Sequence, residues 1–273
     1  MASRDSPIRA LLTVMVTAVV CSLFVSASVV LLRPIQLNNK LLQRSGNVLA
    51  LTGLLPADGE IDDEALLELF KGLDARVVNI DDAKLASEFD PYTFDERKAV
   101  TDPELSVAIA SGDDLANLGR RSRYETVYLV WSKGELQRVV LPIRGSGMWS
   151  MLYGYIALES DFNTIAGVMF YEQNETPGLG DQIAKPHWQQ KWVGKKLYEG
   201  TDEVLFHVAE GPVAAGASGA DYQVDALTGA TITANAVTAL MQYWFGPHGY
   251  GPLLQRMREQ PPKQPSTTAG QES

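Results

Sequence analysis

The sequence predicts an α+β fold, an antiparallel sheet with flanking helices, preceded by one N-terminal transmembrane helix. Three observations support this prediction. Residues 10–32 form an apolar run without a charged side chain. Strand-like segments follow one another closely between residues 126 and 171, separated by short polar turns. Helical patterns lie toward the two ends, so the chain lacks the alternation of strands and helices that is typical of doubly wound nucleotide-binding folds.

The apolar run lies between Arg9 and Arg33. As a helix it would be about 34 Å long, against a hydrocarbon core of about 30 Å. A cleaved signal peptide has an apolar region of only about 7–15 residues, and a lipoprotein would need a small residue before Cys21, where Val20 stands. We therefore expect a retained membrane anchor. Positive charges are nearly balanced on its two sides, so charge alone does not orient it. The very short N-terminal side favours a cytoplasmic N-terminus.

The remaining elements follow from periodicity and turn residues. Gly53 with Pro56, Gly72, and Gly246 with Pro247 are predicted to end helices. The expected helices are 37–55, 62–71 and 232–245, and the expected strands are 77–80, 126–131, 136–143, 153–158, 165–171, 204–208 and 222–224.

Composition excludes several classes of function. The net charge is −10, and the chain has no cluster of Lys and Arg, which argues against nucleic acid as a partner. The single cysteine, Cys21, lies inside the apolar run, so the rest of the chain has no disulfide and no cysteine-ligated zinc or iron–sulfur cluster. The three histidines lack metal-ligand spacing. We therefore predict no metal site.

Two segments interrupt the strand region with small residues. Residues 144–154 contain Ser146, Trp149 and glycines that allow a backbone or a planar ligand to approach closely. By itself this segment is also consistent with a bend around a core tryptophan. In residues 175–181, Pro177 fixes one backbone dihedral and the following Gly178 and Gly180 permit positive φ, which predicts a rigid loop with several free backbone N–H groups. A plain surface turn is the alternative interpretation.

A third segment, residues 225–233, lies between a strand and the last helix. The N-terminus of a helix exposes N–H groups and attracts phosphate. By spacing alone, Thr228 or Thr231 is interpreted as a simple helix cap. The segment lacks the pattern of a P-loop, which argues against nucleotide hydrolysis.

Residues 225–231 fit Asp-x-x-Ser/Thr-Gly-Ala-Thr and resemble the flavinylation motif of the FMN-binding domain family. In that family FMN is esterified through its phosphate to the last threonine of the motif, here Thr231. The segments Gly-Ser-Gly-Met-Trp-Ser-Met-Leu-Tyr-Gly-Tyr and Glu-Thr-Pro-Gly-Leu-Gly further resemble the C subunit of Na⁺-translocating NADH:quinone oxidoreductases. The FMN-binding resemblance covers about residues 140–245, and the resemblance to the C subunit covers most of the chain before the tail.

The resemblance implies a cofactor site around Thr231 and no catalytic residue. Small residues before it would let the phosphate lie against the backbone, and Trp149 and Leu179 would pack on the faces of the flavin ring. Asp225 would serve the enzyme that attaches the flavin. The implied binding residues are Ser146, Trp149, Glu175, Thr176, Pro177, Gly178, Leu179, Gly180, Asp225, Leu227, Thr228, Gly229, Ala230, Thr231 and Thr233.

The resemblance also implies an electron-transfer subunit of a Na⁺-pumping complex in the bacterial inner membrane, with covalent FMN on the periplasmic side. Sister subunits would oxidise NADH and reduce quinone, so the chain alone would be inactive, and a flavin transferase would attach the FMN. The predicted organisation is a short segment 1–9, a transmembrane helix 10–32, an N-terminal part 33–140, an FMN-binding domain 141–252 and a flexible tail 253–273.

Two other functions remain open at this point. One is the flavin subunit of an Rnf-type, ferredoxin-linked complex. The tryptophan-containing segment 144–155 argues against it. The other is a cofactor-free, membrane-anchored assembly module. The intact motif ending in Thr231 argues against it.

Overall fold

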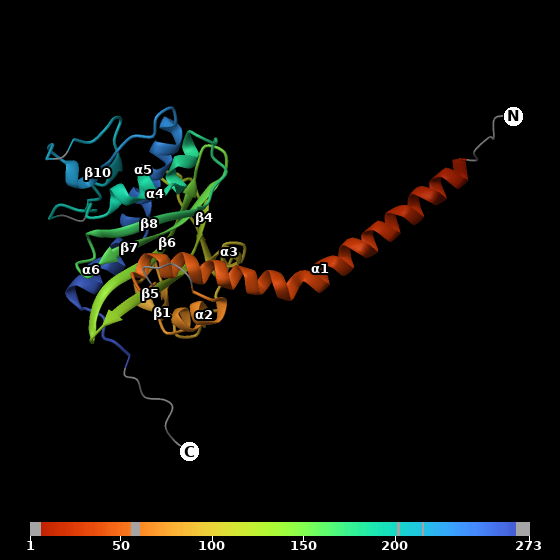
Figure 1. The fold of residues 1–273 in the computed structure, drawn as a ribbon, viewed down its shortest axis with the longest axis horizontal. Helices are drawn as coiled ribbons and strands as arrows, with labels where there is room; N and C mark the ends of the chain where they lie inside the picture. Colours follow the sequence, from red (N-terminus) through yellow and green to blue (C-terminus); the bar gives the residue numbers. More distant parts are fainter. Residues whose placement is uncertain (1–6, 56–60, 201–202, 215, 266–273) are drawn as a thin grey trace, which may run out of the picture. The chain divides into compact units, whose positions relative to one another are not determined.

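The computed structural model describes residues 7–55, 61–200, 203–214 and 216–265 (Figure 1). The chain divides into two compact units, residues 1–46 and 47–273. Helix α1, Pro7–Thr52, begins in the first unit and ends in the second, where Gly53 adopts a φ of 75°. The predicted helices 10–32 and 37–55 are therefore one helix. Pro34 lies inside this helix.

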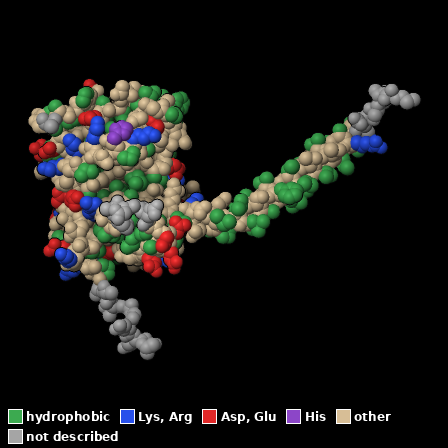
Figure 2. Space-filling model, viewed as in Figure 1, with side chains coloured by type: hydrophobic (Ala, Val, Ile, Leu, Met, Phe, Trp, Pro, Cys, Tyr) green, Lys and Arg blue, Asp and Glu red, His purple; other side chains and the backbone are tan. Residues whose placement is uncertain are grey.

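Within the first unit, α1 exposes apolar side chains along its length, shown in green in Figure 2. Its hydroxyl groups bond back to the helix itself: Thr13 and Thr17 donate to backbone carbonyls four residues earlier at 2.9 and 2.8 Å. Hydrocarbon requires such internal satisfaction of polar groups. By length and composition, α1 is able to cross a membrane.

The second unit is built on a six-stranded antiparallel sheet, which confirms the predicted fold class. Its strand order is β2-β1-β5-β6-β7-β8. The predicted hairpin at Lys133 and Gly134 is present, and both residues have positive φ, as a two-residue hairpin turn requires. The strands of the sheet are β1 Asp74–Asn79, β2 Lys84–Leu85, β5 Tyr124–Ser132, β6 Glu135–Ser146, β7 Met151–Glu159 and β8 Ile165–Glu172.

One face of the sheet packs on helix α5, Thr231–Phe245, and forms the main core. Val237, Leu240 and Trp244 are fully buried there. Gly145 in β6 lies so close to α5 that an added Cβ would meet the Leu240 Cβ at 3.0 Å. The close approach of β6 and α5 depends on this glycine, because any side chain would separate the two elements.

The opposite face carries a row of aromatic rings. Phe70 of helix α2, Asp63–Lys71, lies 5.6 Å from the Tyr128 ring, and Tyr155 and Tyr171 continue the row at 6.5 and 5.2 Å. Helix α2 begins as predicted, with the Asp62 carboxylate accepting from the Ala65 N–H at 2.8 Å. Both faces of the sheet are thus covered within this unit.

Smaller elements surround the sheet (Figure 1). They include a short parallel pair, β9 with β10. The sequence predicted antiparallel pairing and did not predict this pair. The elements are α3 Glu96–Ala99, β3 Ser106–Ala108, β4 Arg120–Ser122, η1 Gly180–Ala184, α4 Pro186–Gln189, η2 Gln190–Trp192, β9 His207–Val208, η3 Ala220–Tyr222, β10 Gln223–Val224 and α6 Gly251–Glu259.

Two predicted boundaries need correction. The chain does not become a flexible tail at residue 253, because α6 buries Leu253, Leu254 and Met257 in the main core. Nor does a boundary fall between residues 140 and 141, since β6 runs through this point and the second unit is continuous from 47. The tail residues 266–273 lie outside the described residues.

Candidate functional site

The motif threonine Thr231 is the first residue of α5, and its side chain is exposed. Ala230 occupies the capping position, and no side chain caps the helix. The interpretation of Thr228 or Thr231 as a simple helix cap is therefore wrong. The 15-residue helix begins with uncapped N–H groups and the positive end of its dipole beside an exposed hydroxyl.

The loop of residues 175–180 lies against this helix start. An added Cβ on Gly229, whose φ is 72°, would meet the Leu179 side chain at 3.1 Å. A Cβ on Gly180 would meet the Thr233 hydroxyl oxygen at 2.7 Å. The second and third segments are thus in direct contact, and glycine is needed at the contact points.

The expectation of several free N–H groups in residues 175–181 is wrong for four of these residues. The Gly178 N–H donates to the Asp181 carboxylate at 2.7 Å, and the Leu179 and Asp181 N–H groups donate to the Thr176 carbonyl. The Glu175 N–H donates to the Gln173 side chain. The loop is rigid because it uses most of its own donors.

The turn between β6 and β7, residues 147–150, completes the arrangement. Strand β7 pairs with both β6 and β8, so this turn and the residues after β8 lie at the same end of the sheet. The Trp149 indole N–H donates to the Thr176 hydroxyl at 3.1 Å. The Asn174 N–H donates to the Ser150 hydroxyl at 3.1 Å. We call residues 147–150, 175–180 and 228–233 together the cradle.

Glu175 connects all three parts of the cradle. Its side chain is buried, with 4% of its surface exposed. One carboxylate oxygen accepts from the Trp149 backbone N–H at 3.1 Å, and the other accepts from the Thr233 hydroxyl. Sequence reasoning placed Glu175 and Thr233 in the site but did not identify this bridge, since nothing local in the sequence indicates it.

Three predicted site residues have contacts outside the cradle. The Asp225 carboxylate accepts from the Lys191 ammonium and from the Val213 N–H at 2.8 Å. The hydrogen bond from Lys191 lowers the pKa of Asp225. Leu227 is buried in the main core, and Ser146 is half-buried at the end of β6. These contacts give Asp225 a local structural role, because they fix the first residue of the motif.

Large apolar side chains are exposed on the cradle. Trp149 is 65% exposed and Leu179 is 40% exposed, and sequence reasoning selected both. It missed Ile232 and Met148, which are 57% and 46% exposed and lie inside the quoted segments. Their positions next to Thr231 and Trp149 were the available signal. Exposed apolar side chains on a rigid frame mark a surface for a ligand or a partner.

These features fit FMN. An uncapped helix start suits a phosphate, small residues at 228–230 let it approach the backbone, and exposed Trp149 and Leu179 offer apolar surface to a planar ring. An open flank at Gly178, with no atom within 4 Å of an added Cβ, leaves space beside the loop. The residues of the cradle thus fit the phosphate and the planar ring of FMN.

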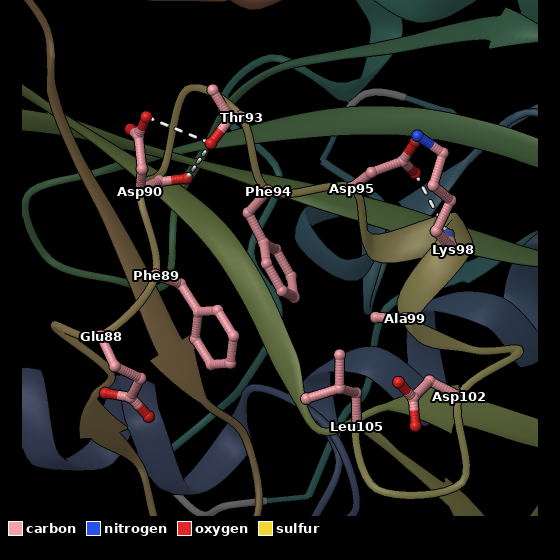
Figure 3. A pocket seen from close by; sticks show the side chains of 10 residues that line it. All are labelled: Glu88, Phe89, Asp90, Thr93, Phe94, Asp95, Lys98, Ala99, Asp102 and Leu105. Atoms are coloured by element: carbon pink, nitrogen blue, oxygen red, sulfur yellow. Dashed lines mark hydrogen bonds and ion pairs between the residues drawn. The ribbon is translucent and has the colours of Figure 1, made fainter.

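A cavity of about 390 Å³ lies elsewhere in the second unit and contains none of the motif residues (Figure 3). Phe89 and Phe94, with ring centroids 5.0 Å apart, form part of its lining. Two of its acidic residues serve local turns: Asp90 bonds to Thr93, and Asp95 caps α3 and pairs with Lys98. These carboxylates are therefore used within the local fold of this part of the chain.

A buried ion pair supports the strand that leads into the cradle. The Arg144 guanidinium donates to the Glu125 carboxylate at 2.7 and 3.2 Å. Burial raises the pKa of Glu125 to about 7, against the opposing effect of Arg144. The Trp244 indole N–H donates to the Arg144 carbonyl at 2.6 Å, which ties α5 to β6.

Comparison with known proteins gives consistent results. Residues 147–246 match the model of the FMN-binding domain family. The C subunit of the Na⁺-translocating NADH-quinone reductase of Pseudomonas aeruginosa is 39% identical over 95% of this chain and 99% of that protein. Its counterpart from Neisseria meningitidis serogroup B is 38% identical over 93% and 96%.

A solved structure is also similar. The crystal structure of Shewanella oneidensis NqrC has a TM-score of 0.74 and 34% identity, and it covers 81% of this chain and 99% of that chain. These results support the first of the three functions that the sequence left open. The protein belongs to the family of NqrC, the C subunit of Na⁺-translocating NADH-quinone reductases, which are oxidoreductase complexes, and it has an FMN-binding domain.

Proposed function

We propose that this protein carries FMN bonded covalently through its phosphate to the Thr231 hydroxyl, and that it passes electrons within the complex. The observation that supports this most directly is the position of Thr231, exposed at the uncapped start of α5 and beside the apolar side chains of the cradle. FMN, when bound, supplies the redox chemistry.

The residues of the chain have separate roles in this proposal. The start of α5 stabilises the phosphodiester charge through its N–H groups and dipole, by about 0.3–1 kcal/mol or more where partly buried. Gly229 and Ala230 leave room for the phosphate. Trp149 and Leu179 cover the ring faces. The Thr176 hydroxyl holds the Trp149 indole in place.

The proposal extends to location and maturation. Helix α1 anchors the chain in the inner membrane. The second unit lies on the periplasmic side, and the short N-terminal segment remains on the cytoplasmic side. A flavin transferase attaches the FMN, and an exposed acceptor hydroxyl at Thr231 is accessible to such an enzyme. The other subunits of the complex supply and accept the electrons.

The test compares wild type with Thr231→Ala and Thr228→Ala. Each full-length chain is co-expressed with a flavin transferase, denatured, and examined in a gel for flavin fluorescence. We expect fluorescent bands for wild type and Thr228→Ala and a dark band for Thr231→Ala. Thr228 is the matched control because it is an exposed threonine of the same segment. A dark wild-type band, with a positive control protein labelled in parallel, would refute covalent attachment.

A further inference from the structure

We infer that Glu175 is the positioning residue of the flavin site: its buried carboxylate fixes Trp149 and the first turn of α5 in their places before FMN is attached. This inference rests on the proposed function, because it concerns how the chain prepares Thr231 and Trp149 for the cofactor. Nothing in the inference requires Glu175 to touch FMN.

The carboxylate is held from two sides. The Trp149 backbone N–H donates to one oxygen at 3.1 Å, and the Thr233 hydroxyl donates to the other. Trp149 also bonds through its indole to Thr176, the next residue after Glu175. Both N–H groups of Trp149 are therefore fixed to the same loop, and the loop is fixed to a residue two positions after Thr231.

Two glycines provide the space that Glu175 occupies. An added Cβ on Gly147 would lie 2.6 Å from a Glu175 carboxylate oxygen, and an added Cβ on Gly180 would lie 2.8 Å from the Glu175 Cβ. These positions admit no larger residue without movement of Glu175. Gly147 and Gly180 belong to two of the segments that the hydrogen bonds of Glu175 join. The packing and the hydrogen bonds are therefore both centred on Glu175.

A carboxylate suits this position for an electrostatic reason. Within the described ranges, Glu175 forms no ion pair with a lysine or arginine, so its charge depends on hydrogen bonds and on nearby dipoles. Thr233 lies in the first turn of α5, where the helix dipole favours an anion. The two hydrogen bonds and the dipole of α5 thus stabilise a carboxylate at the point where the segments of the cradle meet.

The experiment uses the full-length chain in detergent with the variants Glu175→Ala, Glu175→Gln and Glu172→Gln. Glu172 is the control, because it lies just before the loop on β8 with a half-exposed side chain that pairs with Arg97. Hydrogen exchange of the Trp149 amide is measured on chain made without transferase, by selective ¹⁵N labelling. The initial rate of flavin attachment is then measured with purified transferase.

In Glu175→Ala we expect the Trp149 amide to exchange at least about tenfold faster and flavin attachment to slow at least about tenfold, as the loss of a hydrogen bond to a charged group predicts. Glu175→Gln should keep both rates within about threefold of wild type, because its amide oxygen accepts from Trp149 and its amide nitrogen donates to the Thr233 oxygen. Glu172→Gln should match wild type.

Wild-type exchange at Trp149 in Glu175→Ala would overturn the inference, and so would faster exchange with an unchanged attachment rate. If Glu175→Ala does not fold, Thr233→Val and Thr233→Ser test the same bridge from its other end: valine should slow attachment and serine should restore it, and equal rates would refute the bridge. Failure of the proposed function can be told apart from failure of this inference. In the first case the wild-type chain would take up no flavin, whereas in the second case it still would.

Discussion

Replacing Gly180 with alanine adds a methyl group between α5 and the loop of the cradle. The added carbon would lie 2.7 Å from the Thr233 hydroxyl oxygen and 2.8 Å from the Glu175 Cβ. Contacts between carbon atoms are most favourable at about 3.5–4.0 Å, so the contact with the Glu175 Cβ would be too short by about 0.7 Å or more. Neither neighbour is the free end of a flexible side chain, because both belong to the buried bridge.

Two costs follow from this overlap. Overpacking of a well-filled interior costs about 1–3 kcal/mol. Relief requires Thr233 and Glu175 to separate, and a hydrogen bond to a charged group is worth about 1.5–3 kcal/mol. The two costs are coupled and not additive, so we expect a loss of about 3 kcal/mol in the free energy of unfolding.

The assay is urea unfolding of the full-length chain in detergent, followed by tryptophan fluorescence, since Trp192 and Trp244 are fully buried. Gly112→Ala is the matched control, because no atom lies within 4 Å of its added Cβ. A free energy of unfolding for Gly180→Ala within about 0.5 kcal/mol of the Gly112→Ala value would refute the reasoning.

Three further predictions concern the surroundings of the cradle. Glu125→Ala leaves the buried Arg144 charge unpaired and should cost about 3–5 kcal/mol in urea unfolding; a loss below about 1 kcal/mol would contradict it. Trp244→Phe leaves the Arg144 carbonyl without its donor and should cost about 1–3 kcal/mol, so an unchanged unfolding midpoint would argue against this bond. Lys191→Met should raise the pKa of Asp225 in a ¹³C titration, because the hydrogen bond from Lys191 lowers this pKa. The lowered pKa stabilises the folded chain above the pKa that Asp225 has in the unfolded chain, and this stabilisation is lost as the pH falls through the pKa of the folded chain. Equal unfolding of wild type and Lys191→Met in acid would contradict this prediction.

The element types were predictable where local patterns are strong. The apolar run predicted the N-terminal helix, the turn residues Lys133 and Gly134 predicted the β5–β6 hairpin, and periodicity predicted α5. Helix α6 was missed because Gly246 and Pro247 end the preceding pattern and the new one is only nine residues long. The apolar face of α6 contacts the main core, which is formed by residues distant in the sequence, so the nine residues of α6 alone do not reveal it.

The site shows the same division. The motifs predicted that Thr231, Trp149 and the 175–180 loop belong to one site. They did not predict the absence of a cap at Ala230 or the occupied N–H groups of the loop. Both depend on the conformation that neighbouring segments impose. Side-chain bonds across 58 positions, such as that from Thr233 to Glu175, leave no local trace in the sequence.

The sequence by itself determined that the chain begins with a helix of membrane-spanning length, that antiparallel strands follow, and that its motifs belong to an FMN-binding family. Only the tertiary structure decided that the three motifs form one cradle around a buried Glu175. The physical reason is that periodicity and turn chemistry act over a few residues, whereas burial and hydrogen bonding of a side chain depend on which distant strands and helices pack against it.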